Sequence, residues 1–94
     1  LDSENPNDWK LAIIEADIIL GELLDKHGYA GTSIGEQLKS IPPTRLQSLD
    51  DAWDAHKVRN QIAHAGADFV LTKKLARDTI GRYQRVFTEL GEGV

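Results

Sequence analysis

The residues best suited to chemistry lie between positions 56 and 64 of the chain. His56, Asn60 and His64 are spaced by four residues, with Arg59 beside them. In a helix this spacing places the three in one row that drifts slowly around the axis, since four residues advance about 40° beyond a full turn. Histidine exchanges protons near neutrality, and the forked donors of arginine suit two oxygens of one anion. The segment therefore predicts a helix with one polar flank whose side chains are capable of chemistry.

Asp17 is the candidate buried acid. It lies on the same helical face as Leu20 and Leu24, and this face should look inward. An arginine in a small bundle often neutralises such a carboxylate, so we also expect Arg59 as the partner of Asp17. On this interpretation the polar row only fixes the register of the bundle.

Possible metal ligands form no compact set. Asp54 and His56 are two residues apart and point to different sides of a helix, and Asp50 and Asp51 do not complete a site with them. The acids fit better as favourable charges at the positive end of a helix. The chain has no cysteine, which excludes disulfides and thiolate metal sites. We expect no metal and no cofactor.

Two helices are predicted in the first half of the chain. Apolar residues at steps of three and four predict a helix from about residue 6 to His27, with Gly28 as a left-handed stop. A short second helix should follow Ser33, which has capping-box spacing, and should end before Pro42-Pro43 because proline cannot donate to a helix ladder.

Two further helices are predicted in the second half. Thr44 and Gln47 repeat the capping-box spacing and predict the start of a third helix, which carries the polar row and runs to Gly66. Thr72 caps a fourth helix that ends at Gly91, after a short connection.

These elements predict an all-α fold. No segment alternates with period two for long enough to favour a sheet. Three long helices and one short helix, joined by short links, predict a small antiparallel up-and-down bundle. We expect one domain over residues 1–94, with flexible ends at 1–5 and 92–94 and with Trp9 and Trp53 as core anchors.

Composition and charge restrict the partners. The formal net charge of −4 is unfavourable for general binding to polyanions, so any RNA contact needs a local site. No apolar run approaches the roughly 20 residues of a membrane span, and we expect no membrane contact and a cytoplasmic location. The chain begins at Leu1 and lacks methionine, which predicts a domain excised from a longer protein. A membrane anchor before Leu1 stays open.

The segment 58–64, VRNQIAH, resembles the R-N-x-x-A-H form of the arginine–histidine signature of HEPN domains. These are compact helical bundles with the signature near the end of the third main helix, and the resemblance covers the chain from about Trp9 to Leu90. It implies a homodimer with one shared cleft and metal-independent RNA cleavage. His64 would transfer a proton, Arg59 would hold the scissile phosphate, and Asn60 would orient His64 or the phosphate.

The same resemblance allows a second hypothesis, because many HEPN domains lack catalysis and serve as binding or dimerisation modules. The first hypothesis is a dimeric domain that cleaves RNA, or binds RNA or a nucleotide, at Arg59, Asn60 and His64, with His56 and Asp17 in support. His56 lies outside the family pattern. The second is a non-catalytic structural or protein-interaction module of a larger protein, membrane-tethered or not. Whether the chain is an enzyme stays open between the two.

Overall fold

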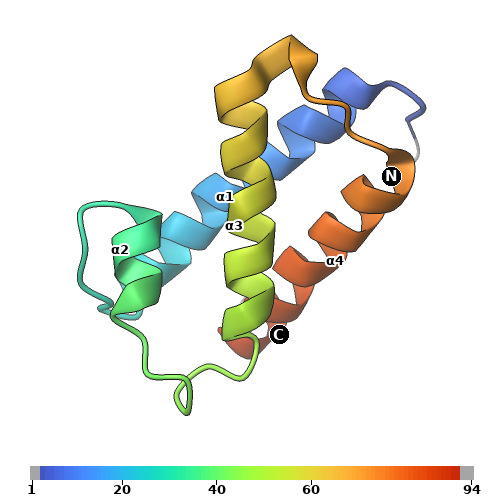
Figure 1. The fold of residues 1–94 in the computed structure, drawn as a ribbon. Helices are drawn as coiled ribbons and strands as arrows, with labels where there is room; N and C mark the ends of the chain where they lie inside the picture. The colour runs from blue at the N-terminus through green and yellow to red at the C-terminus, as the bar shows by residue number, and fades with distance from the viewer. Residues whose placement is uncertain (1–2, 92–94) are drawn as a thin grey trace.

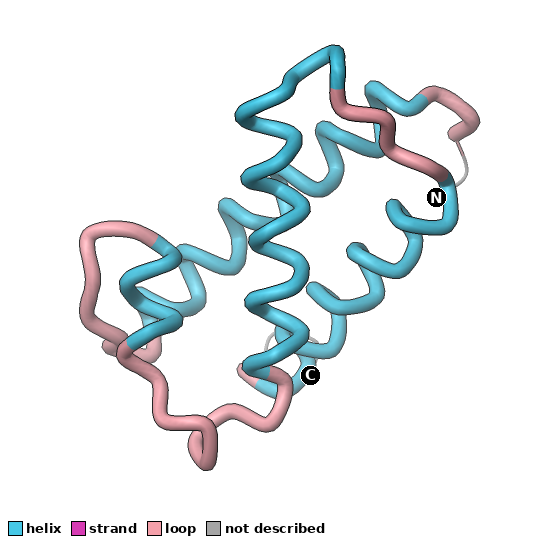
Figure 2. Tube along the Cα trace, viewed as in Figure 1, coloured by secondary structure: helices cyan, strands magenta, loops and turns pink. Residues whose placement is uncertain are grey.

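The computed structural model describes residues 3–91, which fold into a bundle of helices. The elements are α1 (Pro6–Lys26), α2 (Ile34–Lys39), α3 (Leu49–Ala65), the short 3-10 helix η1 (Gly66–Asp68) and α4 (Lys73–Glu89) (Figure 1). Among these residues there is no strand (Figure 2). The predicted all-α helical bundle is confirmed, and η1 lies where only a connection was expected. The expected flexibility at positions 1–2 and 92–94 concerns residues outside the described range.

Local signals place three helix starts where the sequence predicts them. Asn5, Ser33 and Thr72 each accept a backbone N–H from the first turn of the helix that follows. Such a cap satisfies one of the donors that a helix start leaves without an intrahelical partner. Gly28 follows α1 with a φ of 79°, the left-handed conformation that glycine adopts without strain.

The third helix begins later than the sequence predicts. The expected capping box of Thr44 and Gln47 is wrong, because residues 43–48 form turns and α3 starts only at Leu49. The carboxylate of Glu89, at the end of α4, accepts the backbone N–H groups of Gln47 and Ser48 at 2.7 Å each. A side chain from the far end of the chain thus holds the start of α3, so the local capping pattern does not decide it.

Contacts between helix ends fix the directions of the three long helices. Lys73 at the start of α4 forms an ion pair with Glu4, just before α1, so α1 and α4 start together. Lys10 in the first turns of α1 donates to the carbonyl oxygen of Gly66, directly after α3, at 2.9 Å. Helix α3 therefore runs against both α1 and α4, and the short α2 packs on α1 and α3 (Figure 1).

The apolar core lies between the long helices and reaches under α2. Trp9 is 6% exposed and belongs to it, as expected. The expectation that Trp53 anchors the core is wrong, since its side chain is only partly buried and packs against the edge. The neighbouring Ala52 and Ala55 are fully buried instead, which turns Trp53 toward the rim of the bundle. The buried apolar residues are Trp9, Ile13, Leu20, Leu23, Leu24, Leu38, Ile41, Leu46, Leu49, Ala52, Ala55, Ile62, Leu71, Ala76, Tyr83 and Val86.

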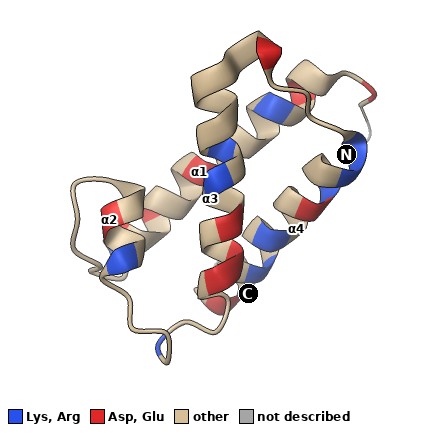
Figure 3. Cartoon of the chain, in the orientation of Figure 1, with Lys and Arg blue, Asp and Glu red and all other residues tan. Residues whose placement is uncertain are grey.

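The acids at the start of α3 pair with bases of α4. Asp51 accepts from Arg82 at 2.8 Å and from Arg85 at 3.1 Å, and Asp54 lies 3.1 Å from Arg82 (Figure 3). The hydrogen bond from Arg85 holds the pKa of Asp51 below its usual value, against the opposing effect of partial burial. These acids therefore join two helices, in addition to lying at the positive end of α3. No helix within residues 3–91 has the length and apolar character to cross a membrane.

Candidate functional site

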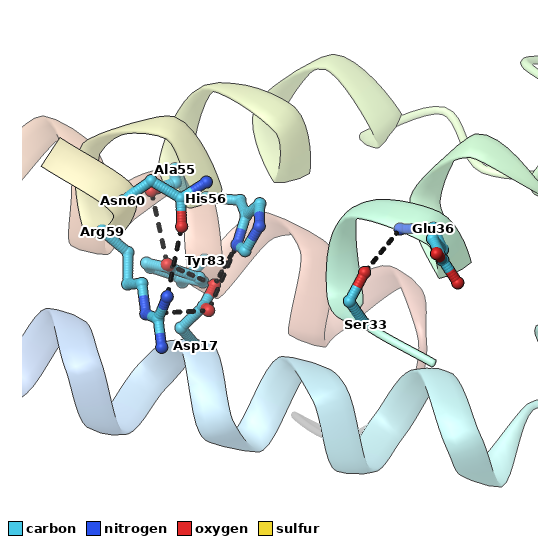
Figure 4. A network of polar contacts seen from close by, with 8 residues as sticks. All are labelled: Asp17, Ser33, Glu36, Ala55, His56, Arg59, Asn60 and Tyr83. Carbon is cyan, nitrogen blue, oxygen red and sulfur yellow. Dashed lines mark hydrogen bonds and ion pairs between the residues drawn. The ribbon is translucent and has the colours of Figure 1, made fainter. Parts of the chain in front are cut away.

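Asp17 is the centre of a polar cluster inside the bundle. The residue is 2% exposed and projects from α1 between α3 and α4 (Figure 4). His56 Nδ1 donates to its two carboxylate oxygens at 3.0 and 3.2 Å, and the Tyr83 hydroxyl donates to Oδ1 at 2.8 Å. Arg59 Nε lies 3.5 Å from Oδ2. The predicted ion pair of Arg59 with Asp17 is present, with two further donors beside it.

The cluster satisfies a carboxylate that burial would otherwise disfavour. Removing a charge from water costs several kcal/mol unless partners replace the lost hydration. Here His56 and Tyr83 make short hydrogen bonds and Arg59 supplies the opposite charge. Burial, followed by the nearby charge of Asp17, raises the pKa of the Tyr83 hydroxyl well above its ordinary value. Tyr83 therefore stays a hydrogen-bond donor to Asp17 at neutral pH.

Arg59 connects this interior cluster to the surface. Its side chain is 36% exposed, while that of Asp17 is 2% exposed. Its Nη1 donates to Asn60 Oδ1 at 3.1 Å, and within residues 3–91 no acceptor takes a hydrogen bond from Nη2. The guanidinium is thus held through Nε and Nη1, while Nη2 has no acceptor among the described residues.

An open hollow of about 420 Å³ lies beside the cluster, between α2 and α3. Its lining consists of Asp17, Ser33, Ile34, Gly35, His56, Arg59 and Asn60. A Cβ built on Gly35 would lie 4.0 Å from His56 Nε2 and 3.9 Å from Ser33 Oγ, so the bare glycine leaves room next to that ring nitrogen. Ser33 Oγ already accepts the N–H of Glu36. The groups open to a ligand here are therefore Arg59, Asn60 and the outer edge of His56.

Four of the five predicted site residues come together in the structure, and one does not. Asp17, His56, Arg59 and Asn60 share the hollow, whereas His64 is exposed and does not line it. Five residues turn a helix by about 140° relative to Arg59, which carries His64 around α3 away from the arginine. Within one chain, Arg59 and His64 do not form a common site.

Sequence reasoning missed two parts of this site. Tyr83 lies on the buried face of α4, and a buried phenol usually finds a hydrogen-bond partner and so indicates a polar group nearby. The rim formed by Ser33, Ile34 and Gly35 left no chemical signal, because only the docking of α2 on α3 brings it next to His56.

The arrangement suits proton transfer next to a bound anion better than metal chemistry. No group of three or more His, Cys, Asp and Glu residues with metal-binding geometry exists among residues 3–91. A carboxylate-bound histidine beside an arginine can accept a proton and hold an oxyanion. A second hollow of about 430 Å³, beside the last turns of α1, is lined by neither histidine nor arginine.

The comparisons with known proteins add no relative. No protein-family model matches the chain, and neither the curated proteins nor the solved structures contain a match. The HEPN resemblance therefore depends on the segment 58–64 and its place near the end of α3 alone.

Proposed function

We propose that this domain binds the phosphodiester backbone of RNA at the hollow beside Arg59 and, as a homodimer, cleaves it without a metal ion. One observation carries the proposal. Arg59 pairs with a buried carboxylate and lines a hollow that also contains His56 and Asn60, with no acceptor for Nη2 among the described residues. Both arginine and histidine are suited to the charge that develops on a phosphate during transfer.

Arg59 has the role of phosphate binder in this proposal. Its ion pair with Asp17 and its hydrogen bond to Asn60 orient the guanidinium before a ligand arrives, which lowers the cost of ordering it on binding. Asn60 occupies Nη1 through its side-chain oxygen, so its own amide N–H groups stay available to a second phosphate oxygen.

The homodimer gives His64 a place in the reaction. His64 is exposed at the end of α3 and lies outside the hollow of its own chain. A second copy related by a twofold axis could present its His64 to this hollow, where the histidine would exchange a proton with the substrate. Exposed Leu11 and Ile18 on the neighbouring helix α1 supply apolar area for such pairing.

Cleavage of single-stranded RNA in excess chelator tests the proposal. We expect activity in the parent chain and a loss of at least about 100-fold in Arg59→Lys and in His64→Gln. Lys57→Gln is the matched control, because it removes an exposed positive charge from the same helix and should leave the rate within about threefold. Activity that survives both Arg59→Lys and His64→Gln, or an inactive parent, would reject a ribonuclease site here.

The second candidate is a non-catalytic module that forms a dimer. It is favoured by the full set of partners that the Asp17 carboxylate already has. Three side chains already bind this carboxylate, so the cluster could have the sole role of holding the helices in place. On this candidate, RNA neither binds nor is cleaved, while the chain still forms a homodimer. Sedimentation together with the RNA assay separates the candidates, since only the first predicts both association and cleavage.

A further inference from the structure

His56, and not His64, carries the features of a general base. His56 is 8% exposed, and a carboxylate can only accept, so its Nδ1 carries the proton in the contact with Asp17. The second nitrogen, Nε2, is then an acceptor with a free lone pair when the ring is neutral. No hydrogen bond to Nε2 exists within residues 3–91.

The surroundings of Nε2 direct it toward a ligand. A Cβ on Gly35 would lie 4.0 Å from it, and His56 lines the open hollow together with Arg59. Asp17 fixes both the tautomer and the plane of the ring, and the Tyr83 hydroxyl in turn fixes Asp17. Nε2 makes no hydrogen bond within residues 3–91 and is not a fully buried atom, so a group that enters the hollow can reach it.

We infer that His56 Nε2 is the base that takes the proton of the ribose 2′-hydroxyl, with Asp17 as its positioning residue and Arg59 of the same chain on the phosphate. This inference depends on the proposed ribonuclease function. It assigns the base to one chain and leaves His64 of a second copy as the acid.

The step balances without a further reactant. As the 2′-oxygen gives its proton to His56 Nε2, it forms a bond to phosphorus and the bond from phosphorus to the 5′-oxygen breaks. The leaving 5′-oxygen takes a proton from protonated His64. The products are a 2′,3′-cyclic phosphate and a 5′-hydroxyl, and Arg59 opposes the charge on the non-bridging oxygens during the transfer.

Two substrates separate the base from the acid. RNA needs a proton on its leaving oxygen, whereas uridine 3′-(4-nitrophenyl phosphate) releases a stable phenolate and needs only the base. We expect His56→Asn to lower the rate at least about 100-fold on both substrates. His64→Gln should lower it by that factor on RNA alone. The asparagine side chain retains an N–H donor near the position of Nδ1, so the contact with Asp17 can persist and melting temperature serves as the folding control.

The outcomes distinguish this inference from the proposed function. A parent that cleaves RNA while His56→Asn keeps its rate overturns the inference and leaves the ribonuclease proposal standing. An equal loss of rate on both substrates in His64→Gln would likewise overturn the inference and leave the ribonuclease proposal standing. A parent that cleaves neither substrate overturns both.

A measurement independent of activity covers the case in which His56→Asn fails to fold. Nitrogen-15 NMR of the parent, at a pH at which the His56 ring is neutral, should show its proton on Nδ1, and Asp17→Asn should disturb this tautomer preference. A proton on Nε2 of the neutral ring would overturn the assignment, because that nitrogen could not then accept one.

Discussion

At the scale of single residues, Arg59 contacts both the buried interior of the bundle and the solvent. Its inner edge faces a carboxylate that is 2% exposed, while its own side chain is 36% exposed. An arginine with only a structural role would not need a solvent-exposed guanidinium. An arginine that only binds a ligand would not need a buried carboxylate as its partner. The stability and activity of variants at this position therefore measure how far each role extends.

Arg59→Ala is expected to lower the free energy of unfolding by about 1–3 kcal/mol, because it removes a charged partner of a buried carboxylate. The loss should be smaller than for a fully stranded buried charge, because His56 and Tyr83 still donate to Asp17. Thermal and urea denaturation measure the difference.

His64→Ala and Lys57→Ala are the controls for this variant, since both residues are exposed on α3. Each should change the free energy of unfolding by no more than about 0.5 kcal/mol. A loss for Arg59→Ala that matches these controls would show that the ion pair with Asp17 contributes nothing to the fold.

At the scale of elements, α2 is short but shapes the hollow. Gly35 lies in its first turn without a left-handed backbone, and a Cβ there would meet only ordinary contacts at 3.9 and 4.0 Å. The absence of a side chain is therefore not required by the fold. It matters only for the space beside His56.

Gly35→Ala should thus separate stability from function. We expect the free energy of unfolding to rise by about 0.5–1 kcal/mol, the usual gain from alanine within a helix, while RNA cleavage falls because the methyl group narrows the hollow. Gly81→Ala in α4 is the matched control, since its Cβ would meet only Arg85 at 3.7 Å. It should gain similar stability and keep its activity. An unchanged rate in Gly35→Ala would argue against the hollow as the substrate site.

Glu89 links α4 to the start of α3 and predicts a pH effect. Partial desolvation acts to raise its pKa, but the hydrogen bonds from Ser48 and Gln47 outweigh this and hold the pKa below the ordinary 4.5. A lowered pKa means that the stabilisation is complete above the ordinary value and is lost as the pH falls through the folded value.

Glu89→Gln should therefore be less stable than the parent at neutral pH, and the difference should shrink as the pH falls below 4.5. Melting temperatures across this range test the prediction, with Glu15→Gln as a control that removes an exposed acid of α1. A difference that does not depend on pH would mean that the charge of Glu89 has no part in holding α3.

The elements differ in how far the sequence predicts them. Helices α1, α2 and α4 begin with local caps at Asn5, Ser33 and Thr72, and a window of a few residues is enough to find such signals. The start of α3 depends on Glu89, more than 40 residues away, and no local pattern contains that information.

The candidate site was also predictable only where local sequence signals decide the structure. Helical spacing was enough to place His56 and Asn60 on one face, and the pairing of Arg59 with Asp17 follows from a buried acid that needs a cation. The part played by Tyr83, and the separation of His64 from the hollow, depend on how the helices cross. Periodicity within one helix does not determine that geometry.

At the scale of the whole molecule, the exposed apolar residues of α1 favour association. Leu11 and Ile18 are 54% and 55% exposed, and Ile18 directly follows Asp17, about 100° further around the helix. Scattered exposed aliphatic side chains are ordinary, but these lie on one side of α1 beside the face that meets α3. A twofold pairing there would cover them and bring a second α3 close to the hollow.

Sedimentation at micromolar concentration should give about twice the chain mass of 10.4 kDa. Ile18→Glu should shift the chain toward the monomer, because pairing would then bury a charge. Val70→Glu is the control, since Val70 is 82% exposed and lies outside α1. A parent that sediments at the mass of one chain would remove the shared site together with the role of a second His64.

The contact of Glu89 with the start of α3 also has a consequence for the order of folding. Gln47 and Ser48 are synthesised some 40 residues before the carboxylate that holds them, and Asp17 precedes the Tyr83 hydroxyl by 66 residues. Contacts so distant along the chain must wait until the intervening segment has closed. We therefore expect α1 and α3 to form helical turns during synthesis and to pack firmly only after α4 has left the ribosome. The domain should therefore gain protection from proteases in one late step, close to the release of residue 89.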